Sequence, residues 1–253
     1  MHLSRRLSEL FNPLLNSLDG RVQRHRVNSR ILISEPNRFV FYRIPKAGHS
    51  TVGKTLVYYD PHLTSEERQE ITLSGSKSGP YLHPRELGRS RARVAWREYF
   101  KLTFVRNPYR RVLSAYLDKI ARIKPATKNL GTSPVDEQGQ PLPFLAFLDQ
   151  IKGAALYEGP HWAPQVALLP RDLARLDFIG RLEKIDTDLA TVIERVYGRK
   201  MASGVQNWDS HKTKSGDDFH RYYDGSAIDT VRHLYREDFE AFGYSLDPET
   251  ALR

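Results

Sequence analysis

The chain has 253 residues, 40% of them hydrophobic and 27% charged, which suits one globular domain with a substantial core. Its 39 lysines and arginines against 30 acids give a net charge of +9, which favours anionic partners such as nucleotides and phosphorylated or sulfated sugars. The lack of cysteine excludes disulfides and thiolate metal sites, and no basic stripe with interleaved aromatics indicates nucleic acid.

The N-terminal part repeats leucine and phenylalanine at three- and four-residue spacing over residues 3–18, which predicts an amphipathic helix. We expect residues 1–37 to form this helix and a connector, and residues 38–253 to form a single domain. A homodimer could form through the helix. Because no run of about 18 apolar residues and no secretion signal occurs, we expect a soluble cytoplasmic protein; a membrane-associated or Golgi-type lumenal domain is the alternative.

Two strand–loop–helix units follow along the chain. Residues 38–44 are rich in aromatic and β-branched side chains and end at Pro45, which predicts a strand, and residues 50–59 predict a helix. The same order recurs as a strand over 100–105 and a helix from Pro108 to about residue 120. This repetition predicts an α/β fold with a central parallel sheet flanked by helices.

The rest of the chain predicts a long loop and further short elements. Residues 124–143 collect proline, glycine and small polar residues with little periodicity, which indicates the loop. Helices are expected at 144–151, 161–169, 187–197 and 226–242, and a strand at 177–180.

The turn after the first predicted strand is suited to binding phosphate. Residues 45–51 place backbone N–H groups and the positive end of a helix dipole around one point. Gly48 allows close backbone approach, Ser50 and Thr51 offer hydroxyl groups, and Lys46 offers a movable positive charge.

A P-loop of the ATP-dependent kinase or NTPase type is the rival interpretation of the same stretch. Residues 48–55, from Gly48 to Thr55, match G-x-x-x-x-G-K-[ST], with Lys54 as the lysine. Such a site also needs an acidic residue after a second strand to hold magnesium. The best candidate, Asp177, precedes its apolar neighbours, so the rival lacks a part.

The second unit decides between these interpretations. Arg106 ends its strand and Ser114 follows eight residues later, so both can face one side and hold an anion. Arg110 and Arg111 are expected on the helix surface, where they could steer an anionic acceptor, although such arginines usually only bind water and form ion pairs. The sequences IPKAGHST at 44–51 and FVRNPYRRVLSAY at 104–116 together resemble the PAPS-dependent sulfotransferases (PAPS, 3′-phosphoadenosine 5′-phosphosulfate), especially the Golgi carbohydrate sulfotransferases and their bacterial relatives. The resemblance covers residues 38–245, with later blocks at 81–83, 161–165, 176–183 and 234–244.

The resemblance implies a P-loop-like sulfotransferase fold and transfer of a sulfuryl group from PAPS to an acceptor hydroxyl, expected on a carbohydrate. Adenosine 3′,5′-bisphosphate leaves, a histidine takes the hydroxyl proton, and no metal is required. Lys46 would stabilise charge on the leaving phosphate, and Arg106 with Ser114 would hold the 3′-phosphate. The 5′-phosphosulfate loop would comprise Lys46, Ala47, Gly48, His49, Ser50 and Thr51.

Three histidines are candidates for the base. His83 is preferred because it lies 23 residues before Arg106, near where the related glycan sulfotransferases place their catalytic histidine. His49 is a loop residue whose role stays open. His161 begins a block with Trp162 and Gln165 that could contact substrate, or could equally be a cap and packed aromatic. A non-catalytic nucleotide- or glycan-binding protein is the alternative from another class; it would tolerate loss of Lys46 and His83.

Overall fold

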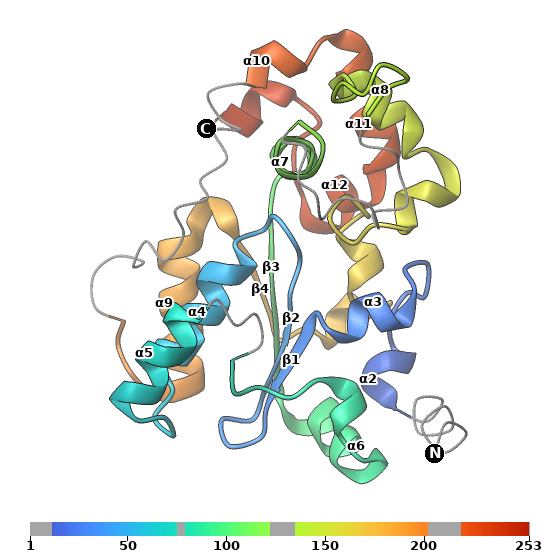
Figure 1. Ribbon diagram of the computed structural model, residues 1–253. Helices are drawn as coiled ribbons and strands as arrows, with labels where there is room; N and C mark the ends of the chain where they lie inside the picture. Colours follow the sequence, from blue (N-terminus) through green and yellow to red (C-terminus); the bar gives the residue numbers. More distant parts are fainter. Residues whose placement is uncertain (1–11, 75–78, 122–134, 202–218, 253) are drawn as a thin grey trace.

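A four-stranded mixed sheet lies at the centre of the molecule (Figure 1). The computed structural model describes residues 12–74, 79–121, 135–201 and 219–252. The strands, in spatial order, are β1 (Ile31–Ser34), β2 (Phe39–Tyr42), β3 (Phe100–Val105) and β4 (Phe178–Arg181). β2, β3 and β4 run parallel, whereas β1 pairs antiparallel to β2. The expected parallel sheet is therefore confirmed for these three strands and is wrong for the β1 edge.

The predicted strands lie where their residue types place them. All four residues of β2 and all but the first of β3 are buried, because helices cover both faces of the sheet. β4 begins one residue later than predicted. β1 was not predicted, since its four residues lie within the segment assigned to the connector. The predicted boundary between residues 37 and 38 falls inside the hairpin that joins β1 to β2.

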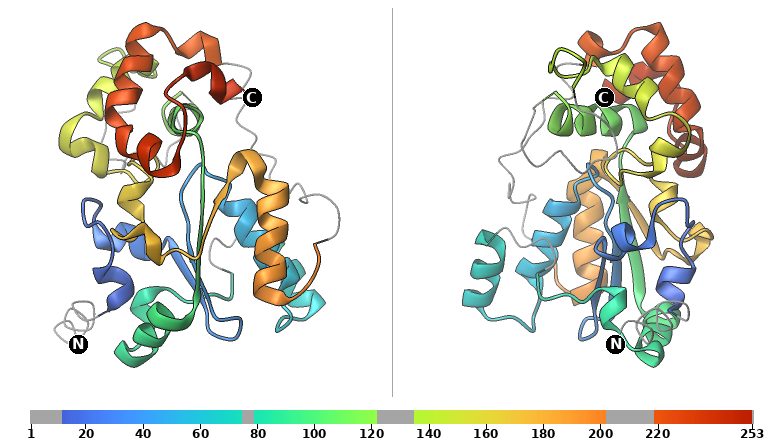
Figure 2. Two further views of the ribbon diagram at one scale, coloured as in Figure 1. Left: turned by 180° about the vertical axis from the view of Figure 1, so that it is seen from behind. Right: turned by 45° about the vertical axis from the view of Figure 1, so that its right-hand side comes forward.

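Helices surround the sheet in three groups, each with its own hydrophobic cluster (Figures 1 and 2). One face is covered by α4 (His49–Tyr59), α5 (Ser65–Leu73) and α9 (Ile185–Tyr197), and the other by α2 (Pro13–Asn16), α3 (Arg24–Asn28) and α6 (Arg89–Glu98). At the carboxyl ends of the parallel strands lie α7 (Pro108–Lys119), α8 (Phe144–Gln150), α10 (Phe219–Tyr222), α11 (Gly225–Leu234) and α12 (Arg236–Phe242). Short 3₁₀ turns occur at Pro84–Glu86, Gly153–Tyr157, Val166–Leu168, Leu173–Arg175, Leu182–Lys184 and Pro248–Leu252.

Most helix predictions are confirmed, with two corrections. The predicted helix at 226–242 is divided at Tyr235, whose hydroxyl donates to the Trp162 carbonyl oxygen at 2.6 Å. The predicted helix at 161–169 is wrong: turns and the short Val166–Leu168 segment occupy it. Here the Asp238 carboxylate accepts the backbone N–H groups of Gln165 and Val166 in place of helix carbonyls.

Some predictions fall wholly or partly outside the described residues. Of the predicted 3–18 helix, only α2 is described, and most of the predicted 124–143 loop lies outside. No helix in the described ranges is long and apolar enough to cross a membrane.

Candidate active site

The loop between β2 and α4 turns sharply at two positions in the left-handed region. Lys46 has φ 68° and Gly48 has φ 74°. Glycine adopts this conformation without strain, whereas lysine does so at a cost that the surrounding structure must offset. A Cβ on Gly48 would also lie 2.7 Å from Leu182 Cδ1. Because Gly48 is the N-cap of α4 and has no side chain, it provides no side-chain cap for the first amides of the helix.

An ion pair fixes the Lys46 side chain. Its Nζ lies 2.8 Å from Asp118 Oδ2 on α7, and both side chains are mostly buried. Burial lowers the pKa of Lys46, and Asp118 opposes that shift. Burial raises the pKa of Asp118, but Lys46 and Lys119 outweigh it and hold that pKa below its usual value. The lysine and the carboxylate are therefore held side by side in a largely buried pair.

Arg106 meets the same loop from the end of β3. Its Nη1 donates to the Lys46 carbonyl oxygen at 3.3 Å. The side-chain amide of the fully buried Gln165 forms two hydrogen bonds with the backbone of Arg106: it accepts from Arg106 N at 2.9 Å and donates to Arg106 O at 2.9 Å. Burial lowers the pKa of Arg106 to about 10, against the opposing charge of Glu183. The guanidinium is thus held, still charged at neutral pH, where β2 and β3 end.

The helix after Arg106 begins as its sequence predicts. Asn107 caps α7 by accepting from Tyr109 N at 3.0 Å, and Pro108 occupies the first turn. Ser114 lies buried within this helix. Its predicted part in holding a phosphate with Arg106 stays a prediction.

Arg111 is the most informative residue that sequence reasoning missed. It was expected at the helix surface, yet its side chain is only 1% exposed. It donates to the carbonyl oxygens of Pro45, Ala163 and Pro160 at 3.0, 2.7 and 3.2 Å. Its spacing of three residues from Ser114, on one helix face, was the available signal. Arg111 therefore connects residues 160–163 to the loop between β2 and α4, residues 43–48, which we name the phosphate loop after its predicted role.

His83 lies at the end of the sheet where the phosphate loop begins. Its Nδ1 lies 2.9 Å from the carbonyl oxygen of Ile31, which pairs with Tyr42 at the end of β2. Since a carbonyl oxygen only accepts, Nδ1 carries the proton and Nε2 is the basic nitrogen of the neutral ring. His49 begins α4.

His161 and its neighbours are set by packing. Burial lowers the pKa of His161 well below its usual value, and the charges of Arg30 and Lys119 add to this, so the ring is neutral at neutral pH. Trp162 is fully buried, with its indole N–H donating to Ala155 O at 3.3 Å. The described contacts of Trp162 and Gln165 are thus with the protein, and the predicted substrate contacts of the three residues stay predictions.

The structure lacks the geometry of a P-loop. α4 begins at His49, so the residues that would wrap around phosphates are already helical, and Thr55 is buried. Asp177 directly precedes β4, at the opposite end of the sheet from the loop that leads into α4, and its carboxylate accepts from Lys101 N at 2.8 Å. Within the described ranges, no group of three or more histidines or acids could hold a metal, so no metal ligands can be named.

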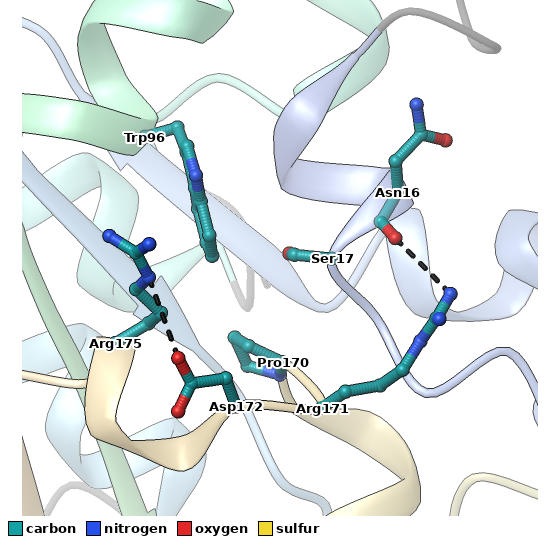
Figure 3. Close-up of a pocket in the computed structure, with 7 residues that line it drawn as sticks. All are labelled: Asn16, Ser17, Trp96, Pro170, Arg171, Asp172 and Arg175. Atoms are coloured by element: carbon teal, nitrogen blue, oxygen red, sulfur yellow. Dashed lines mark hydrogen bonds and ion pairs between the residues drawn. The ribbon is translucent and has the colours of Figure 1, made fainter.

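A pocket of about 280 Å³ lies away from these residues, at the amino end of the sheet (Figure 3). Trp96 on α6 forms one wall, and Arg175, whose guanidinium lies 5.8 Å from the Trp96 ring centroid, forms another. None of the predicted site residues lines this pocket.

The fold and site define an α/β protein with a sharply turned loop at the carboxyl end of its sheet, contacted by an arginine from the end of the neighbouring strand. The family model described as "Sulfotransferase family" matches residues 29–245, and the chain belongs to that family. The resemblance stated from the sequence is thereby confirmed.

Curated relatives agree with this assignment. The chain is 24% identical to carbohydrate sulfotransferase 14 of Danio rerio, over 90% of this chain and 66% of that protein. Identity to the Homo sapiens carbohydrate sulfotransferase 14 is 26%, over 88% and 62%, and to carbohydrate sulfotransferase 10 of Xenopus laevis 24%, over 86% and 68%. The chain therefore spans slightly less than two thirds of the first of these relatives. No solved structure shows significant similarity to it.

Proposed function

We propose that this chain transfers the sulfuryl group of PAPS to a hydroxyl of a carbohydrate, releasing adenosine 3′,5′-bisphosphate. The observation that carries the proposal is the meeting of Lys46 and Arg106 at the ends of adjacent parallel strands, joined by the 3.3 Å hydrogen bond from Arg106 Nη1 to Lys46 O. Family membership and the carbohydrate sulfotransferase relatives support it.

The residues present fit such a donor. The uncapped start of α4 and the hydroxyls of Ser50 and Thr51 suit the 5′-phosphate, and Arg106 with Ser114 suits the 3′-phosphate. Bound PAPS supplies a sulfuryl group already activated by its link to phosphate. Lys46, held by Asp118 beside the loop, meets the negative charge that grows on the leaving oxygen.

The transfer step needs one base. The acceptor oxygen forms a bond to sulfur while the bond between sulfur and the bridging phosphate oxygen breaks. The electron pair of the broken bond stays on the oxygen of the leaving phosphate. The acceptor proton passes to His83 Nε2, because the Ile31 carbonyl holds the Nδ1 proton in place. His83 touches the reacting hydroxyl in this proposal and is its catalytic base.

Calorimetric titration tests the donor class. Adenosine 3′,5′-bisphosphate and Mg-ATP are each titrated into the unaltered chain, Arg106→Ala and Lys54→Ala. We expect micromolar binding of the bisphosphate, weakened at least tenfold by Arg106→Ala because a charged hydrogen-bond donor is lost, and unchanged by Lys54→Ala. Preference for Mg-ATP, lost in Lys54→Ala, would support a P-loop enzyme instead.

Turnover separates an enzyme from a binding protein of the same fold. Labelled PAPS is incubated with a carbohydrate panel and the unaltered chain, Lys46→Ala or His83→Ala. Transfer that drops at least 100-fold in either variant supports the proposal. Tight bisphosphate binding without transfer to any member of the panel would favour a non-catalytic nucleotide- or glycan-binding protein.

A further inference from the structure

Two arginines face each other at the ends of β1 and β2. The register pairs Ile31 with Tyr42, and one step further Arg43 N donates to Arg30 O at 2.8 Å. Arg43 is only 5% exposed, and its Nη2 donates to Ser29 O. Like charges placed directly opposite on neighbouring strands repel each other. The pair therefore costs stability unless something compensates for it.

Among the described residues, no acid compensates for the charge of Arg30. Burial lowers the pKa of Arg30, and no carboxylate in the described ranges contributes to it. Burial lowers the pKa of Arg43 to about 10, and the Arg30 charge adds to that shift. Arg30 Nε is buried without a hydrogen-bond partner among the described residues. Buried donors and charges of this kind are stabilised when an anion binds them.

His161 lies beside this pair. Arg26 donates to Glu158 O, which brings residues 158–163 against α3, the helix that leads to Arg30. Arg30 is the foremost of the charges that lower the pKa of His161, after burial. His161 Nδ1 is buried and, within the part of the chain described, has no hydrogen-bond partner. Arg30 and His161 are thus close enough to interact electrostatically, and each has one buried nitrogen atom without a partner among the described residues.

Within the group of Arg30, Arg43 and His161, Arg30 lies near His83, where the acceptor hydroxyl is proposed to bind. Ile31, the residue after Arg30, holds His83 through its carbonyl oxygen. On the other side, Lys46 and His49 are close enough to His161 to affect its pKa. The group is therefore connected to His83 through the backbone of Ile31 and interacts electrostatically with residues of the phosphate loop. Arg106 and the start of α4 already supply partners for the donor phosphates.

We propose that Arg30, Arg43 and His161 form a second anion site that binds an acidic group of the acceptor, a carboxylate or a sulfate ester. The site selects acidic saccharides over neutral ones and holds them with a hydroxyl between His83 and Lys46. This inference rests on the proposed function, since it concerns the acceptor of the same reaction.

Equilibrium binding to the chain saturated with adenosine 3′,5′-bisphosphate tests the site. The probes are a uronate-containing oligosaccharide, its carboxyl-reduced counterpart, and a sulfate ester of that neutral counterpart. We expect the acidic probes to bind at least tenfold more tightly than the neutral one. Arg30→Gln should remove that preference, and Arg30→Lys should keep part of it. The matched control is Arg93→Gln, which removes an exposed charge on α6 and should change nothing. The two acidic probes show which acidic group is preferred.

A second readout follows the His161 ring by NMR. A bound anion should raise the pKa of His161 in the unaltered chain and much less in Arg30→Gln, because the anion offsets the charges of Arg30, Lys119, Lys46 and His49 around that ring.

The outcomes separate the two proposals. Equal or absent binding of acidic and neutral probes, with bisphosphate binding intact, would overturn the second anion site alone. Weaker bisphosphate binding in Arg30→Gln would reassign these residues to the donor and also overturn it. No bisphosphate binding by the unaltered chain would overturn the proposed function itself.

Discussion

Lys46 Nζ and Asp118 Oδ2 are 2.8 Å apart, which links the phosphate loop directly to α7. The carboxylate raises the pKa of a lysine whose burial lowers it. Asp118→Asn should therefore lower the pKa of Lys46 further, and the alkaline limb of the pH–rate profile should move to lower pH. Loss of a negative charge beside the donor should also tighten bisphosphate binding, by roughly fivefold.

The matched control is Asp149→Asn, which removes an exposed carboxylate that pairs with Lys152 on the surface. It should leave both the profile and the affinity unchanged. An Asp118→Asn variant with an unmoved alkaline limb would show that Lys46 does not set it.

Gly48 and Gly53 should respond oppositely to alanine. Gly48→Ala forces a left-handed alanine, which costs about 1–2 kcal/mol, and its Cβ would also meet Leu182. We expect a lower Tm and weaker bisphosphate binding. Gly53 lies inside α4 with nothing within 4 Å of an added Cβ, so Gly53→Ala should raise the free energy of unfolding by about 0.5–1 kcal/mol. Loss of nucleotide binding in Gly53→Ala would instead point to a P-loop.

Gln165 should act through Arg106. Gln165→Leu removes two hydrogen bonds to the Arg106 backbone and should cost about 2 kcal/mol of unfolding free energy. Bisphosphate affinity should fall as the guanidinium loses its fixed position. Gln165→Glu can still accept from Arg106 N but cannot donate to Arg106 O, so an intermediate loss is expected. Urea unfolding and calorimetry measure the two effects, and unchanged affinity in Gln165→Leu would contradict this positioning role.

Arg111 should be important for stability despite its charge. Arg111→Met fits the apolar surroundings but leaves three carbonyl oxygens without their donor, and should cost about 3 kcal/mol or more. Arg111→Lys should recover only part of this, because an ammonium cannot reach three separated carbonyl oxygens with guanidinium geometry. The contrast with Arg236→Met, at an exposed position on α12, provides the control. Equal Tm values for these two methionine variants would contradict the assignment.

Local sequence patterns predicted the parts of the fold that depend on local chemistry. The runs before Pro45 and Arg106 became β2 and β3, because apolar strands with helices on both faces have a clear sequence pattern. β1 could not be placed, since its antiparallel pairing depends on the hairpin that follows it rather than on its own four residues. The failed helix at 161–169 has a similar cause: Asp238, 73 residues from Gln165, takes its backbone N–H.

In the candidate site too, features set by local sequence could be predicted and features set by contacts with distant residues could not. The phosphate loop and Arg106 could be located from sequence because each lies directly after a strand. Arg111 and the Arg30–Arg43 pair could not, because an arginine in a sequence is usually solvated. Only the packing of α7 buries Arg111, and only the pairing of β1 with β2 buries Arg43 and the Nε of Arg30.

The antiparallel β1 lies at the edge of the sheet, next to β2 and away from β3 and β4. Exchanging residues 28–30, with Ile31 and His83 kept, would leave the ladder between β2 and β3 and the phosphate loop intact. Variant libraries confined to this edge therefore offer a route to altered sugar preference without rebuilding the nucleotide site.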